Sequence, residues 1–96
     1  MHDASARGPE SSLEHSEQLG LVRRLIAELD EEKREVFILT ELEGMTMAEI
    51  AEALDVNPNT VSSRLRAARR QFEEALEREA QRDRDDERER MERRAR

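Results

Sequence analysis

The apolar residues of this chain stand mostly singly or in pairs, and the longest uninterrupted apolar run is the four residues Val36–Leu39. Charged residues make up 43% of the 96 positions and aromatic residues only 2%. A chain of this size buries one small core, and spacings of three and four between apolar residues place them on helix faces. Strong helix formers such as Glu, Arg, Ala and Leu dominate the composition. The sequence therefore predicts an all-α fold.

Composition also excludes several classes of function. The absence of cysteine rules out a disulfide framework, a thiolate metal site and a cysteine nucleophile. The longest apolar run is far too short for a membrane span, and no charged-then-apolar leader opens the chain, so we expect a cytoplasmic protein with no membrane partner. His2 and His15 are too isolated to predict a metal site, and the carboxylates fall on helix faces without a pocket. We expect no enzyme activity, catalytic residue or cofactor.

Two helices are predicted before the middle of the chain. Residues 1–12 are small and polar and contain Gly8-Pro9, which is typical of a disordered leader or linker, and we expect this segment to extend over residues 1–13. The first helix is predicted to begin at residue 14 or 17 and to end at residue 28. The second is predicted over residues 31–43, with Asp30 as its cap. Its expected core residues are Val36, Phe37, Leu39 and Leu42.

The most strongly marked stretch is a short helix, a three-residue break and a longer helix. Thr46 and Glu49 fit a capping box, which predicts a helix over residues 47–54. Asp55 tolerates the left-handed backbone that such a break needs, and Pro58 suits the first position of the following helix. This is the pattern of a helix-turn-helix.

The last helix is predicted to carry one apolar stripe, made by Val61, Leu65, Ala68, Phe72 and Leu76. From Glu73 onward, acidic residues followed four positions later by arginine replace the apolar residues. We therefore predict a four-helix domain over residues 14–80, whose long last helix runs into a charged, partly helical tail over residues 81–96.

The net charge of −7 conceals one basic segment. Residues 10–57 hold thirteen acidic and four basic residues, and residues 73–96 hold ten acidic residues and eight arginines. Residues 58–72 hold four arginines and no acid. Phosphate binding needs a positive face, so this segment is the candidate for contact with nucleic acid.

With the apolar stripe turned inward, the polar side chains of the last helix face outward. The candidate DNA-binding residues are Asn59, Thr60, Ser62, Ser63, Arg64, Arg66, Arg69 and Arg70. Ser62, Ser63 and Arg66 are best placed to reach base edges, because arginine bonds guanine bidentately and serine both donates and accepts. Phosphate contacts are expected from Thr60, Arg64, Arg69 and Arg70.

These residues resemble a known family. The stretches Gly44–Leu54 (GMTMAEIAEAL) and Asn57–Arg69 (NPNTVSSRLRAAR) resemble region four of bacterial RNA polymerase sigma factors, nearest to the extracytoplasmic-function class. The resemblance covers roughly residues 17–76. It implies a four-helix domain whose last helix recognises the upstream (minus-thirty-five) element of double-stranded promoter DNA. It also implies that the first helices pack against the β flap of core RNA polymerase.

The chain departs from that family in several places. Asp30 stands where proline is usual, Asp55 where glycine is usual, and Ala67 where arginine is frequent. Nothing resembles region two, and the only aromatic residues, Phe37 and Phe72, are predicted to be core rather than a platform for a melted base. We therefore expect either a fragment of a sigma factor or a freestanding domain.

Two other functions stay open on the sequence. One is a standalone helix-turn-helix regulator that binds its own operator as a dimer, although no second apolar surface for a dimer is evident. The other is an interaction module that binds polymerase or an anti-sigma factor without reading DNA. Loss of the basic face would be the mark of such a module, and that face is intact.

Overall fold

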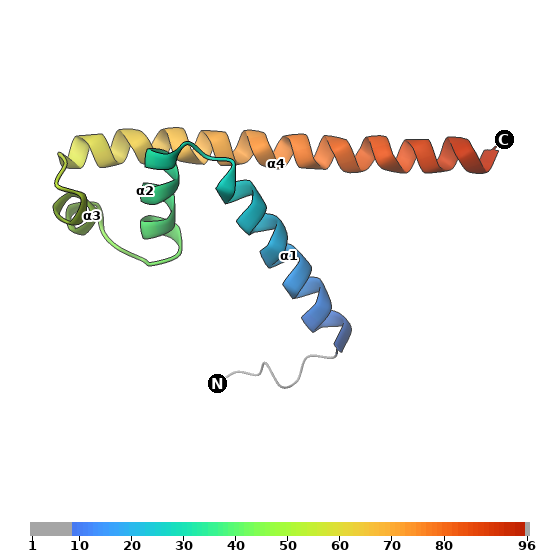
Figure 1. The fold of residues 1–96 in the computed structure, drawn as a ribbon, viewed down its shortest axis with the longest axis horizontal. Coiled ribbons are helices and arrows are strands. Elements are labelled where there is room, and N and C mark those ends of the chain that lie inside the picture. The colour runs from blue at the N-terminus through green and yellow to red at the C-terminus, as the bar shows by residue number, and fades with distance from the viewer. Residues whose placement is uncertain (1–8, 96) are drawn as a thin grey trace.

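The computed structural model describes residues 9–95, which form four helices: α1 (Pro9–Ala27), α2 (Glu31–Glu41), α3 (Met47–Leu54) and α4 (Pro58–Ala95). The described residues contain no strand, so the predicted all-α fold is confirmed. Figure 1 shows α4 as the long axis of the molecule, with α2 and α3 beside its first half and α1 diverging from it. The molecule measures 59 × 36 × 14 Å. No helix within residues 9–95 combines the length and apolar character needed to span a membrane.

The core lies where α2 and α3 meet the first half of α4. Its buried residues are Ile26, Leu29, Val36, Phe37, Ile50, Ala51, Val61, Leu65 and Ala68. The half-buried ring of Phe72 stacks on Phe37 with 5.1 Å between ring centroids. Both aromatic side chains are therefore packed into the core, as predicted, and each aromatic pair of this kind adds to the stability that burial provides.

Two predicted core residues are exposed. Leu42 is 63% exposed, because it follows the last residue of α2 and six steps of an α-helix place it about 120° around the axis from the buried Val36. Leu76 is 44% exposed, whereas its neighbour Ala75 is buried. The small Ala75 lies on the side of α4 that α1 approaches, as shown by the nearby ion pair of Arg78 with Glu28.

Helix α1 begins earlier than predicted. It starts at Pro9 rather than at residue 14 or 17. Proline suits the first helical position, because its missing N–H has no helical partner there in any case. The structure thus makes residues 9–13 helical, although they were predicted as part of a leader; residues 1–8 of that leader lie outside the described residues, as does His2.

Helix α2 ends at Glu41, two residues before the predicted end. Gly44 adopts a left-handed backbone with φ of 70°, a conformation that costs glycine little. This turn directs the Met45 N–H to the Leu39 carbonyl, at 3.0 Å. The chain then leaves α2 and reaches the start of α3 within a few residues.

Helix α4 is longer than predicted, since it continues to Ala95. The predicted tail, residues 81–96, was expected to be only partly helical. Described ion pairs along the tail join residues three or four positions apart, such as Arg90 with Glu87 and Arg93 with Glu89. Pairs at these spacings stabilise a helix locally, and together they keep the tail helical as far as Ala95.

Candidate nucleic-acid interface

The start of α3 is held by a capping box. The Thr46 hydroxyl accepts from the Glu49 N–H at 3.1 Å, and the Glu49 carboxylate accepts from the Thr46 N–H at 2.8 Å. These two bonds satisfy donors that a helix start otherwise leaves free. Ile50 and Ala51, which follow directly, are buried against the core. The predicted cap and the predicted bounds of this helix are both confirmed.

The turn between α3 and α4 depends on one left-handed residue. Asp55 has φ of 56° and ψ of 49°, a backbone that aspartate tolerates better than most residues. The Val56 N–H then donates to the Ala51 carbonyl at 3.0 Å. The side chain of Asn57 accepts from the Asn59 N–H at 2.7 Å, which caps the first turn of α4. The structure thus confirms the predicted helix-turn-helix.

Four candidate residues form one exposed line along α4. Asn59, Ser63, Arg66 and Arg70 are all exposed. Their successive spacings of four, three and four residues keep them on one face of the helix. This face is opposite to the buried residues of α4, among them Val61. Polar and cationic side chains therefore project together into solvent from the first turns of the second helix of the motif; we call these four residues the exposed line.

Two further candidates lie beside this line and are partly covered. Ser62 is half-buried, and its hydroxyl lies 3.9 Å from the sulfur of Met47 at the start of α3. Thr60 is also half-buried. Ser62 was predicted to reach a base edge together with Ser63, and the structure places it next to the exposed line, on the side of α4 that contacts α3.

The remaining two candidates are engaged by acidic residues of α2. The Arg64 guanidinium lies 3.3 Å from the Glu32 carboxylate. Arg69 donates two N–H groups to one oxygen of Glu41, at 3.1 and 2.8 Å. No signal in the sequence could have found these partners, because the paired residues are 32 and 28 positions apart.

One polar contact near the interface shifts a carboxyl group. Gln71 of α4 donates to the Asp30 carboxylate at 3.0 Å, and Lys33 donates to it at 3.2 Å. These hydrogen bonds, that from Gln71 above all, and the charge of Lys33 hold the pKa of Asp30 below its ordinary value of 3.8. Asp30 was predicted to cap α2 with its side chain; it stands at that position but makes no such hydrogen bond.

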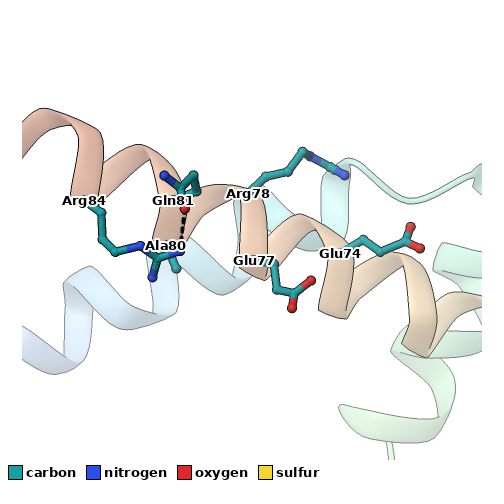
Figure 2. Close-up of a pocket in the computed structure, with 6 residues that line it drawn as sticks. All are labelled: Glu74, Glu77, Arg78, Ala80, Gln81 and Arg84. Atoms are coloured by element: carbon teal, nitrogen blue, oxygen red, sulfur yellow. Dashed lines mark hydrogen bonds between the residues drawn. The ribbon is translucent and has the colours of Figure 1, made fainter.

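A hollow of about 610 Å³ lies along α4, away from the exposed line. Figure 2 shows its lining residues: Glu74, Glu77, Arg78, Ala80, Gln81 and Arg84. All six belong to one helix, and four of them are charged. Binding pockets for small molecules are usually enclosed and largely apolar, so this hollow does not suit such a ligand. Within residues 9–95 no group of three acidic, histidine or cysteine residues is placed to hold a metal ion.

One comparison with known proteins gives a match. The family described as Sigma-70, region 4 matches residues 19–72, which is more than half of the chain and contains α3, the turn and the first part of α4. No curated protein matches the chain significantly. The matched range includes every candidate DNA-binding residue.

Proposed function

Since the chain belongs to the Sigma-70, region 4 family, we propose that it recognises the upstream (minus-thirty-five) promoter element. Domains of this family are DNA-binding helix-turn-helix parts of sigma factors. The observation that carries the finer proposal is the exposed line of α4, Asn59, Ser63, Arg66 and Arg70, set in a segment without acids. The second helix of such a motif lies in the major groove, and this line is the face that it would present there.

The candidate residues divide into two roles in this proposal. Ser63 and Arg66 read base edges, because both are exposed and both can form hydrogen bonds that distinguish bases. Ser62 joins them from the α3 side of the line. Thr60, Arg64, Arg69 and Arg70 meet phosphates, as does Asn59 at the start of the helix, where free N–H groups also attract an anion.

We further propose that α1 and α2 contact the β flap of core RNA polymerase. The part of the chain that precedes α4 is acidic, since residues 10–57 hold thirteen acidic and four basic residues. Such a surface is repelled by the DNA backbone and is available to a protein. Leu42, exposed at the end of α2, supplies an apolar contact there. This activity belongs in the cytoplasm, where polymerase and promoter meet.

The test of base reading is the variant Arg66→Ala. Selection from random duplex DNA first identifies a preferred site. Loss of Arg66 should then weaken binding to that site by about 1–3 kcal/mol and relax the preference at one base pair. Arg88→Ala, which removes an exposed arginine from the far part of α4, is the matched control and should leave the preference unchanged. An equal loss on all sequences would make Arg66 a phosphate contact.

The test of the polymerase contact is direct binding of the whole chain to the isolated β flap. Saturable binding that Leu42→Ala weakens supports the sigma-factor role. If a folded chain binds a selected DNA site but not the flap, the chain acts instead as a regulator at its own operator.

A further inference from the structure

The four arginines of the basic segment fall into two kinds. Arg66 and Arg70 are exposed, and no ion pair to either is formed by the residues that the structure describes. Arg64 and Arg69 are instead paired with Glu32 and Glu41, the contacts given above. Only two of the four arginines in the segment can therefore bind a phosphate without first breaking a described ion pair.

The paired arginines lie on either side of the exposed line. Neighbouring residues of an α-helix are about 100° apart around its axis, so Arg64, which follows Ser63, leaves the line on one side. Arg69, which precedes Arg70, leaves it on the other. Their partners belong to opposite ends of α2: Glu32 stands in its first turn and Glu41 is its last residue. Helix α2 thus places one carboxylate on each flank of the exposed line.

We propose that Glu32 and Glu41 compete with DNA phosphates for Arg64 and Arg69 and so lower the part of the DNA affinity that does not depend on sequence. The inference rests on the proposed function, because it requires that this face binds DNA. Binding to random DNA depends on phosphate contacts almost entirely. A phosphate that recruits either arginine must first displace a carboxylate, and it must approach that carboxylate's negative charge.

The exposure of the pairs sets the size of the effect. The side chains of Arg69 and Glu41 are 54% and 38% exposed, and those of Arg64 and Glu32 are 25% and 70% exposed. Ion pairs in such solvent-accessible positions are weak. The competition should therefore change DNA affinity by about two- to five-fold per pair, which is large enough to measure and small enough for a phosphate to overcome.

The experiment compares Glu41→Gln with Glu43→Gln, and Glu32→Gln with Glu31→Gln, in the full chain. In each comparison, both variants lose one negative charge at or next to the same end of α2. Of these four glutamates, however, only Glu41 and Glu32 form a described ion pair with an arginine of α4. The probe is a fluorescent duplex of random sequence, and the dissociation constant is measured by anisotropy over a series of NaCl concentrations. Circular dichroism confirms that each variant is folded.

The expected result is that Glu41→Gln and Glu32→Gln each bind random DNA about two- to five-fold more tightly than their controls. The plot of log affinity against log salt should steepen by about one for each freed arginine. The double variant Glu41→Gln/Arg69→Ala should lose the gain, because the freed cation is then absent.

The result that overturns the inference is a Glu41→Gln variant that binds like Glu43→Gln, with the same salt dependence. Weaker binding by Glu41→Gln would also overturn it, since the carboxylate would then be orienting Arg69 toward phosphate. In both cases the proposed function stands, because the chain still binds DNA. Absence of DNA binding by every variant, on random and selected duplexes alike, overturns the inference and the proposed function together.

Discussion

The two halves of α4 have the same helical backbone, but different interactions stabilise them. The first half, residues 58–78, contains all the buried residues of the helix: Val61, Leu65, Ala68 and Ala75. The second half, residues 79–95, contains none, and nearly all of it projects beyond the other helices into solvent (Figure 1). Packing against α1, α2 and α3 holds the first half, whereas the second, apart from the ion pair of Glu79 with Arg24 of α1, depends on its own residues.

The second half is supported by local charge pairs. Described pairs join Arg82 with Glu79, Arg88 with Asp85, Arg90 with Glu87 and Arg93 with Glu89. Each such pair stabilises a helix by only about 0.2–0.5 kcal/mol. The candidate DNA-binding residues all lie in the half that packs against the other helices, so the fold determines which of them face outward.

The largest effect on the free energy of unfolding is expected from Leu65→Ala, which removes packing contacts of the first half of α4. Leu65 is 2% exposed within the core, and a leucine truncated at such a site leaves a cavity that costs about 2–5 kcal/mol. Urea unfolding followed by circular dichroism measures this loss. Met91→Ala, which removes an exposed apolar side chain from the second half, should leave the free energy of unfolding unchanged. Equal losses in the two variants would show that the tail is packed after all.

Glu87→Pro should change the stability of the domain less than Leu65→Ala does, but it should clearly reduce the helix content of the tail. Proline in a helix interior costs about 3 kcal/mol, but residue 87 has no tertiary contact to transmit that cost. The helical signal should fall as the end of α4 unwinds, while the urea midpoint of the domain stays the same. Ala67→Pro, in the first half, is the control and should lower that midpoint strongly. A lowered midpoint in Glu87→Pro would mean that the two halves unfold as one unit.

The sequence predicted the parts of the fold that have a local chemical signature. The capping box of Thr46 and Glu49, the left-handed Asp55 and the start of α4 at Pro58 were all identified, because each depends on residues a few positions apart. The exposure of Leu42 and the burial of Ala75 were missed. The exposure of Leu42 follows from its spacing from Val36 and could have been foreseen. The burial of Ala75 depends on where α1 approaches α4, which no local pattern specifies.

The candidate site shows the same limit. The inward apolar stripe was enough to predict that Asn59, Ser63, Arg66 and Arg70 face outward, and the structure shows them exposed. The pairing of Arg69 with Glu41, across 28 positions, was not predictable. In a chain so rich in acids, the choice of partner depends on the crossing of α2 and α4, which only the folded structure defines.

The smallest effect is expected from Asp30→Asn, which weakens a polar contact with Gln71 of the first half of α4, 41 positions away. Because Gln71 and Lys33 lower the pKa of Asp30 in the folded state, its carboxylate stabilises the fold above the ordinary value of 3.8 and stops doing so as the pH falls through the lowered pKa. The variant should therefore unfold at a slightly lower temperature than the wild type at neutral pH, and the difference should disappear in acid. Glu89→Gln, which breaks a pair confined to the second half, should reduce the helical signal without moving the unfolding temperature of the domain. A difference for Asp30→Asn that persists unchanged in acid would assign its effect to the lost geometry at the start of α2 rather than to the charge.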